Sequence, residues 1–288
     1  MKLSKLFQLA NELAPTSVSD EYCARFGAYD NSGVLVNTGE EIRGIVFSLD
    51  FSTAALDEAE RTGANLIITH HPAIYAKISA IDSSSFAPLG EKLTRAMKNG
   101  ISVVSMHLNL DCVSGGIDES LMQGICLASG DEKVGNDKNN KSDKNEGAGT
   151  RLIAIMHPLD KEQSCGYGRV YDVEKTTLGE LVKGMEKTFS TKRIFFYGDE
   201  KKEVKRVASC CGGGGDEEAV EFALKNGADV LVSSDFKHHV LALAKEKGIA
   251  VIALTHYAAE NYGFEKYYQK IRERVKLPCA YCTEKELL

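Results

Sequence analysis

The sequence predicts an α/β protein of two similar lobes, each a mostly parallel sheet flanked by helices. Three observations lead to this fold class: short apolar strand-like segments alternate with helical ones, the same order occurs twice, and a polar stretch separates the two occurrences. The chain has 288 residues, of which 43% are hydrophobic, so it can build two cores. We interpret the repetition as an internal duplication.

The first lobe is expected to cover residues 1–128. It opens with an amphipathic helix over Met1 to Leu13, which lacks the continuous apolar core and cleavage site of a signal peptide. Short and continuously apolar strands then alternate with helices, as in a buried parallel sheet. The expected elements are a strand at Ile45–Leu49, a helix at Ser52–Thr62, a strand at Leu66–Thr69, a further helix, and a strand at Gly100–Val104.

The second lobe, residues 151–288, repeats this order after a segment that is almost devoid of apolar residues. That segment, 129–150, is rich in Asn, Asp, Lys, Gly and Ser, and is expected to be a flexible loop or linker. The repeated elements are a strand at Val207–Cys210, a helix at Glu217–Lys225, a strand at Val230–Val232, a second helix, and a strand at Gly248–Ile252.

Five potential metal ligands follow the ends of these strands: His70, His71, Asp111, His256 and Glu260. Ligands of open parallel sheets bind beyond the carboxyl ends of the strands. A lone histidine near a strand end is usually structural, but four of the seven histidines occupy equivalent positions beside acidic residues. We therefore predict a metal site in the cleft between the lobes.

The adjacency of His70 and His71 favours two metal ions over one, because adjacent residues of an extended chain point in opposite directions. Glu260 follows His256 by one helical turn, so both face the same way, and its carboxylate can bridge two ions. Two divalent ions at about 3.5–4 Å form the usual hydrolytic pair. Mixed histidine and carboxylate ligands suit Zn, Mn, Fe or Co without selecting one of them.

Other candidates near the site have both functional and structural interpretations. His107 is a candidate catalytic residue that could instead orient Asp111 or a metal-associated water. His239 could be a general base or a phosphate contact, or simply bond Asp235 at the start of a helix. The glycines at 212–215 lack the Lys-Ser/Thr of a phosphate-binding P-loop and are interpreted as a tight turn that lines the cleft.

Composition excludes several classes of protein. The net charge is −6, with basic residues scattered among acidic ones, so there is no strong nucleic-acid signal. No apolar run approaches the roughly 20 residues that cross a membrane. Eight cysteines at irregular spacing predict free thiols and a cytoplasmic protein. Cys279 and Cys282 form a C-x-x-C pair without a second pair nearby, and Cys210-Cys211 is interpreted as buried packing.

Several motifs together resemble the Nif-three-like family, whose members are often labelled GTP cyclohydrolase 1 type 2 homologues. The resemblance extends over nearly the whole chain. Two departures, Ser233-Ser234-Asp235 in place of T-G-D or T-G-E and Thr255 in place of a glycine, affect no proposed ligand. The matching segments are Asp30–Gly33, Thr69–Tyr75 with its histidine pair, His107–Asp111, Gly115–Asp118, Gly166–Arg169 and Thr255–Glu260.

The resemblance implies a dinuclear metal site between two α/β lobes. One metal would take His70 and Asp111, the other His71 and His256, with Glu260 shared. It also implies a ring-shaped homohexamer, a histidine at position 239 that recurs in the family, and the absence of the extra domain that some members carry between the lobes. A C-terminal helix near residues 262–276 is expected, by the same resemblance, to pack back on the first lobe.

Two functions are compatible with these features. The first is a metal-dependent hydrolase acting on a small phosphorylated or nucleotide-like molecule, although no motif shows purine recognition. The alternative is a non-catalytic, metal-binding regulatory or interaction protein that forms a ring-shaped oligomer. Metal-dependent turnover that is lost in Glu260→Gln would favour the enzyme.

Overall fold

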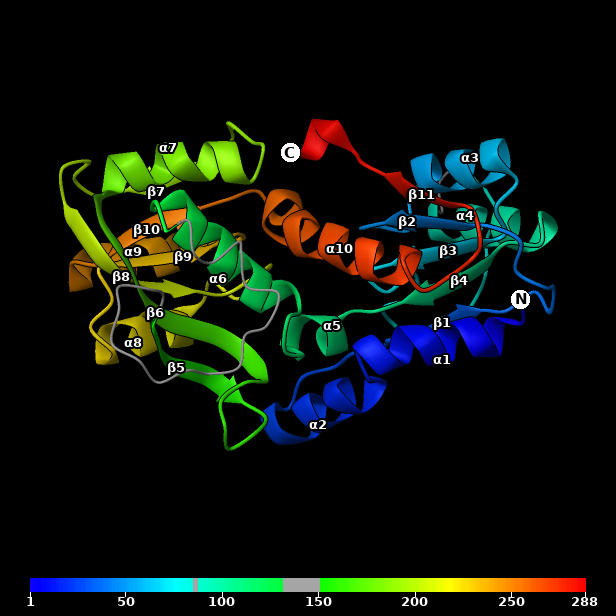
Figure 1. The fold of residues 1–288 in the computed structure, drawn as a ribbon, viewed down its shortest axis with the longest axis horizontal. Coiled ribbons are helices and arrows are strands. Elements are labelled where there is room, and N and C mark those ends of the chain that lie inside the picture. The colour runs from blue at the N-terminus through cyan, green and yellow to red at the C-terminus, as the bar shows by residue number, and fades with distance from the viewer. Residues whose placement is uncertain (85–87, 132–150) are drawn as a thin grey trace. The chain divides into compact units, whose positions relative to one another are not determined.

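Two β-sheets flanked by helices make up the computed structural model, which describes residues 1–84, 88–131 and 151–288 (Figure 1). The α/β fold class predicted from the sequence is confirmed. Most of the predicted linker, residues 132–150, lies outside the described residues. In the described part, no helix is both long and apolar enough to cross a membrane.

The chain divides into two compact units. The first contains Met1–Gly116 and Phe264–Lys285, and the second contains Ile117–Gly263 and Glu286–Leu288. One long helix, α10 (His256–Arg272), therefore begins in the second unit and ends in the first. Residues Phe264–Lys285, near the C-terminus, thus belong to the first unit.

The first unit contains a five-stranded sheet in the order β1-β4-β3-β2-β11. Strands β2, β3, β4 and β11 are parallel, and β1 runs antiparallel to β4. The elements of this unit are α1 (Leu3–Leu13), α2 (Thr16–Phe26), β1 (Gly33–Val36), β2 (Ile45–Ser48), α3 (Thr53–Thr62), β3 (Leu66–Thr69), α4 (Pro88–Lys98), β4 (Ser102–Ser105), α5 (Leu108–Cys112) and β11 (Cys279–Cys282).

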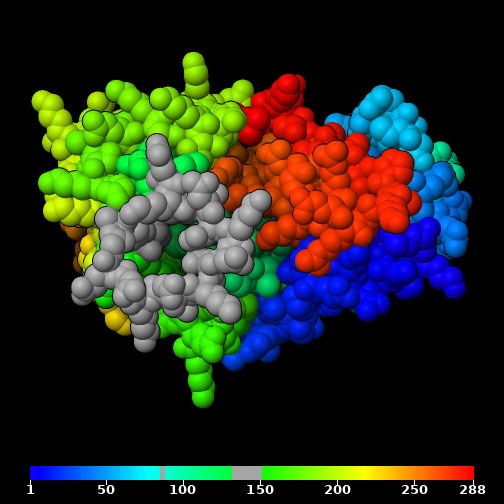
Figure 2. Space-filling view, in the orientation of Figure 1, coloured from blue at the N-terminus to red at the C-terminus, as the bar shows by residue number. Residues whose placement is uncertain are grey.

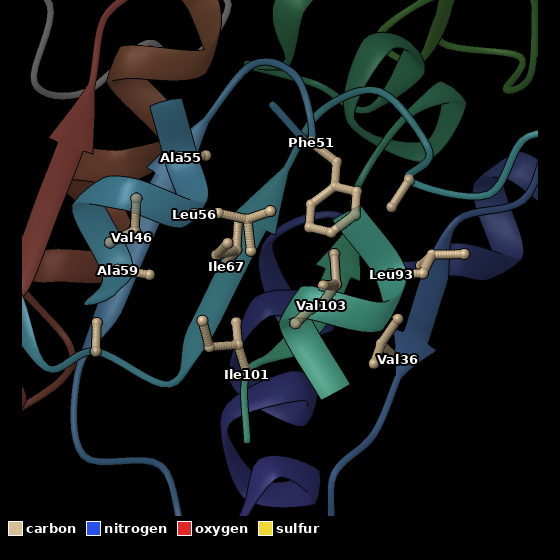
Figure 3. Packing of buried hydrophobic residues seen from close by; sticks show 13 residues of the cluster. Val36, Val46, Phe51, Ala55, Leu56, Ala59, Ile67, Leu93, Ile101 and Val103 are labelled. Atoms are coloured by element: carbon tan, nitrogen blue, oxygen red, sulfur yellow. The ribbon is translucent and has the colours of Figure 1, made fainter. Parts of the chain in front are cut away.

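Helices cover both faces of this sheet. On one face, Val46, Ile67 and Val103 of the central strands pack against α3 and α4 in a buried apolar cluster (Figure 3). On the other face, Phe47 packs against the C-terminal part of α10, 5.1 Å from the ring of Tyr268. Both faces of β2, β3 and β4 are buried, which explains why these strands are continuously apolar or small.

The C-terminal segment is tied to the N-terminal helix within the first unit. The hydroxyl of Tyr267 donates a hydrogen bond to the Ala10 carbonyl at 3.2 Å. In the space-filling view the orange and red C-terminal surface adjoins the blue N-terminal surface (Figure 2). Strand β11 pairs with β2 and extends the sheet by one parallel strand, which the sequence analysis did not anticipate.

The second unit contains a six-stranded mixed sheet in the order β5-β6-β8-β9-β10-β7. Strands β8, β9 and β10 are parallel, whereas β5, β6 and β7 pair antiparallel with their neighbours. The elements are α6 (Ile117–Ala128), β5 (Arg151–Pro158), β6 (Gly166–Thr177), α7 (Leu178–Thr188), β7 (Phe195–Tyr197), β8 (Glu203–Ser209), α8 (Glu217–Lys225), β9 (Val230–Ser233), α9 (His238–Lys247), β10 (Ala250–Ala253) and a short 3-10 helix at Lys285–Leu287.

Helix α6 belongs to the second unit, although the expected lobe boundary placed it in the first. It packs against α7 and β6, on the face of the sheet opposite α8 and α9. Its Gly124 lies against Phe189 with no room for a side chain, since an added Cβ would lie 2.6 Å from that ring. Because α6 packs closely within the second unit, the division between the units lies before this helix and not at the polar segment after it.

The two units repeat one arrangement, β2-α3-β3-α4-β4 in the first and β8-α8-β9-α9-β10 in the second. In each, the three parallel strands lie side by side in chain order. The first helix of each run is capped in the same way, by Ser52 on the Ala55 amide and by Asp216 on the Ala219 amide. The carboxyl ends of the three strands therefore present three equivalent loops in each unit.

Candidate metal centre

In the first unit, three loops at the carboxyl end of the sheet bring histidines and a carboxylate together. His70 and His71 follow β3, which ends at Thr69, and both backbone amides donate to the Leu49 carbonyl. Because these residues lie beyond the strand, the alternation of side chains no longer applies to them. Their rings lie on the same side with centroids 4.9 Å apart, so adjacency alone does not assign them to different ions.

His107 and Asp111 complete this first set. His107 precedes α5 and Asp111 lies within it, so a short helix carries both toward His70. The His70 Nε2 lies 3.5 Å from a carboxylate oxygen of Asp111. One potential ligand atom each from His70, His107 and Asp111 lies within 4.8 Å of the others. His107 is therefore a possible ligand itself, and not only a residue that orients Asp111.

All three histidines of this set are held through the same ring nitrogen. The Nδ1 of His70 lies 2.8 Å from the Met106 carbonyl, and that of His71 lies 2.7 Å from Asp50. A carbonyl or carboxylate oxygen accepts, so each Nδ1 donates and each neutral ring keeps its lone pair on Nε2. Histidine ligands of metals are oriented in this way by partners that do not touch the metal.

Asp30 holds His107, whose Nδ1 lies 2.7 Å from its carboxylate. Burial alone would raise the pKa of Asp30, but hydrogen bonds from His107, Ser19 and Ser32 outweigh it and hold the pKa well below its usual range. Burial lowers the pKa of His107, but the hydrogen bond to Asp30 and the charge of Asp111 raise it overall. Since β1 runs antiparallel to β4, the residues before β1 reach the edge where β4 ends.

The second unit presents an equivalent set at the start of α10. His256 begins this helix and Glu260 lies one turn later, so their side chains meet, with Nε2 and Oε2 3.0 Å apart. The His256 Nδ1 lies 2.6 Å from Asp235, which follows β9. With Nδ1 donating to Asp235, the Nε2 of His256 faces a carboxylate that is only 3% exposed.

Gly212 lets the loop after β8 lie directly on this second set. It has a φ of +54°, and an added Cβ would lie 2.2 Å from the Glu260 carboxylate and 3.2 Å from the His256 Nε2. The interpretation of the glycines as a tight turn beside the site agrees with this geometry. The N-terminus of α8 is capped by Asp216, whose carboxylate occupies the place that a bound anion would take.

A buried ion pair between Asp118 and Arg169 holds the loop that contains Cys211 and Gly212. Asp118 accepts hydrogen bonds from the Arg169 guanidinium, from the Gly168 amide at 3.0 Å and from the Cys211 amide at 3.1 Å. Both charged side chains are at most 1% exposed. The segments Gly115–Asp118 and Gly166–Arg169, which the sequence analysis noted without a role, therefore meet through this pair.

The remaining candidates lie elsewhere. His239 is 60% exposed at its side chain and pairs with Glu217 at 2.8 Å, not with Asp235. It extends from the second residue of α9 toward the acidic first turn of α8. Cys279 and Cys282 are half-buried at the ends of β11, where residues three apart point to opposite faces of a strand. This geometry favours neither a zinc site nor a disulfide between them.

Three carboxylates that orient histidines were not identified as site residues from the sequence: Asp30, Asp50 and Asp235. A signal for two of them exists, because Asp50 follows β2 and Asp235 follows β9 at the same sheet edges as the predicted ligands. Asp30 lies before a strand, and only the antiparallel direction of β1 brings it to the site.

The donors of both units suit a divalent metal ion. Imidazole nitrogens and carboxylate oxygens are common ligands of Zn, Fe, Mn and Co, and His70, Asp111 and Glu260 are nearly or fully buried. A buried carboxylate beside Nε2 atoms that point at it is a costly arrangement unless a proton or a cation neutralises it. The residues present are therefore of the kinds that hold a divalent metal ion.

We expect Asp50→Ala to lower the affinity for Zn²⁺ by about 10–100-fold, because His71 would lose the acceptor that fixes its ring. Asp50→Asn should lose less, since an amide oxygen still accepts from Nδ1. Isothermal titration calorimetry of the metal-free protein measures both. Asp57→Ala, on the exposed surface of the same unit, is the control. Equal affinities in all four proteins would contradict an orienting role.

A model of the family described as Duf34/NIF3 (NGG1p interacting factor 3) matches residues 1–285. A curated relative from Clostridium perfringens, named GTP cyclohydrolase 1 type 2 homolog, is 28% identical over 99% of this chain and 97% of its own. A relative of the same name from Clostridium acetobutylicum is 30% identical over 90% of this chain and 85% of its own.

Solved structures share the fold. A hypothetical protein from Staphylococcus aureus superposes with a TM-score of 0.76 at 21% identity, over 98% of this chain and 96% of its own. The reduced form of HcgD from Methanocaldococcus jannaschii superposes with a TM-score of 0.72 at 24% identity, over 98% of both chains. These similarities extend over both units of the chain.

Proposed function

Because the chain belongs to the Duf34/NIF3 family, we propose that it is a metal-dependent hydrolase with two divalent metal ions at its centre. Its substrate would be a small phosphorylated or nucleotide-like molecule, in keeping with the cyclohydrolase name of its curated relatives. The observation that carries the proposal is the common orientation of four histidines. His70, His71, His107 and His256 each engage an oxygen through Nδ1 and leave Nε2 for a metal.

In the proposed centre, His70 and Asp111 would hold one ion, His71 and His256 would hold the other, and Glu260 would be shared, as the family resemblance implies. Each unit alone offers few donors, so the sets of both units together would provide the ligands that two ions need. His107 either joins the first ion or handles a proton near it. Bound ions would supply Lewis-acid polarisation of a scissile bond and a nucleophile at neutral pH.

The residues of the chain have distinct tasks in this proposal. Asp50, Asp30 and Asp235 keep the rings in one tautomer and one orientation. Glu260 contributes a negative charge that is buried and therefore strongly attracts cations. His107, held by Asp30 through Nδ1, would handle a proton of the reacting groups.

We expect Glu260→Gln to lose metal-dependent turnover by at least about 100-fold, because the neutral amide neither bridges cations nor balances their charge. The native protein would be loaded with Mn²⁺ or Zn²⁺, its metal content measured by elemental analysis, and a panel of nucleotides and phosphoesters screened. The control is Glu217→Gln, an exposed glutamate of the same unit that pairs with the candidate His239. If that control also lost turnover, His239 would have a role in the reaction.

A non-catalytic role is the alternative, and the family description favours it in one respect, because it refers to an interacting factor. In this alternative the metal ions stabilise a ring-shaped oligomer whose surface binds other proteins. Stoichiometric metal with no turnover across the panel would support it. Protein that retains no metal when purified without chelators would contradict both proposals.

The family resemblance also leads us to propose a homohexamer in the cytoplasm. Sedimentation equilibrium of the full chain would distinguish a hexamer from smaller assemblies. A monomer at micromolar concentration would contradict the proposed ring.

A further inference from the structure

The two neighbouring cysteines after β8 have different surroundings. Cys210 belongs to the apolar cluster that β8, β9, α8 and α9 form in the second unit, so for this residue the expectation of buried packing is confirmed. Cys211 is equally buried, at 1% exposure, but lies outside that cluster as the described residues define it. Both residues lie beyond β8, which ends at Ser209, and the second thiol lies beside the Glu260 carboxylate instead of in the apolar cluster.

The thiol of Cys211 lies beside the buried carboxylate of the second ligand set. Its Sγ is within 4.8 Å of a Glu260 oxygen, and Glu260 in turn lies 3.0 Å from the Nε2 of His256. Donor atoms that share one tetrahedral ion are about 3–4 Å apart. The Cys211 sulfur and the His256 Nε2 thus each lie near the Glu260 carboxylate, on which the loop at Gly212 also lies.

The backbone of Cys211 is fixed at both of its polar groups. Its amide donates to Asp118 at 3.1 Å, and its carbonyl accepts a hydrogen bond from the Tyr167 hydroxyl. These two bonds hold the backbone of Cys211, and with it the position of its Cβ, beside Glu260. Such pre-organisation is typical of residues that bind a metal, because the position of the ligand is set before the ion arrives.

We propose that Cys211 is a thiolate ligand of the metal bound by His256 and Glu260. This assignment rests on the proposed metal-binding function and adds a preference of the site for one metal ion over another. Binding of the ion displaces the thiol proton to water, and no electron is transferred. Thiolate is a soft ligand that favours Zn²⁺ over the harder Mn²⁺, so the centre of this chain selects zinc.

X-ray absorption at the zinc edge tests the proposal directly. Metal-free full-length protein is loaded with Zn²⁺ below the stoichiometric amount, so that the tightest site fills first. We expect a zinc–sulfur shell at about 2.3 Å beside nitrogen and oxygen at about 2.0–2.1 Å. The shell should vanish in Cys211→Ala and persist in Cys210→Ala, which removes the neighbouring thiol. The zinc affinity of Cys211→Ala should fall by at least about 10-fold, and its Mn²⁺ affinity should change far less.

Elemental analysis separates the two ways in which the idea can fail. If the native protein binds zinc but shows no sulfur shell, Cys211 is not a ligand and the proposed function survives. A shell that is lost in Cys210→Ala instead would also overturn the assignment. If the native protein binds neither Zn²⁺ nor Mn²⁺, the proposed function itself fails. Should Cys211→Ala not fold, Cys211→Ser replaces it, and the spectrum of the native protein alone still decides.

Discussion

Asp118→Ala is expected to destabilise the second unit by about 3–5 kcal/mol, the largest loss of folding stability we predict for a single substitution in this chain. The change leaves the Arg169 charge buried and removes the acceptor of the Gly168 and Cys211 amides. One guanidinium nitrogen of Arg169 already has no hydrogen-bond partner in the described part of the chain. Asp118 therefore supplies the opposite charge and the hydrogen bond that stabilise the buried guanidinium of Arg169.

The chain offers a matched control in Asp172→Ala. Asp172 pairs with Arg206 at 2.7 Å in the same sheet, but about a third of each side chain is exposed. An exposed pair of this kind contributes at most about 1 kcal/mol. Urea unfolding, combined with hydrogen exchange at the amides of β6 and β8, measures both variants in the unit where they lie. Similar losses in the two proteins would refute the special role of the buried pair.

A double variant separates the energy of the pair from the cost of breaking it. In Asp118→Ala with Arg169→Met, no buried charge remains, so part of the lost stability should return. The amides of Gly168 and Cys211 would still lack their acceptor. The stability of the double variant should therefore fall between that of the native protein and that of Asp118→Ala.

The repeated β-α-β-α-β run could be predicted because its strands are buried on both faces. Continuous apolar segments such as Leu66–Thr69 and Val230–Ser233 leave a clear signal in the sequence. The strands of the second unit that the sequence analysis missed, β5, β6 and β7, pair antiparallel, and β5 and β7 are half-exposed edges. Their residues alternate or mix polar and apolar types, so they lack such a signal.

The ligands could be predicted for a related reason. Residues that follow buried parallel strands reach one edge of the sheet, so His70, His71 and His256 are informative even without coordinates. The orienting carboxylates were missed because their role depends on hydrogen bonds across loops, as between Asp50 and His71. Cys211 shows a similar limit: the sequence does not reveal which of two adjacent thiols faces the core.

The boundary between the units depends on packing that no local pattern reports. Helix α6 is amphipathic and could cover either sheet, but its glycine at position 124 fits against Phe189 of the second unit. Likewise, the C-terminal strand β11 adds to the sheet of the first unit after more than 220 intervening residues. Contacts between residues so far apart in the sequence can be identified only in the folded structure.

Gly212→Ala is expected to lower metal affinity by about 10–100-fold while leaving the fold largely intact. The new Cβ would lie 2.2 Å from the Glu260 carboxylate, which is the mobile end of a long side chain and can swing away. Backbone strain at a φ of +54° costs alanine roughly 1–2 kcal/mol. The substitution should therefore displace a metal ligand at moderate cost in stability.

Gly213→Ala is the matched control, because it lies in the same loop and its added Cβ would have no atom within 4 Å. Its φ lies outside the left-handed region, so alanine fits there without strain. Competition with a chromogenic zinc chelator measures both variants, and circular dichroism confirms that both fold. Weakened zinc binding in Gly212→Ala alone is the expected result, since only that position meets Glu260. Equal zinc affinities in the two folded variants would mean that the Glu260 carboxylate, which Gly212 faces, does not hold zinc.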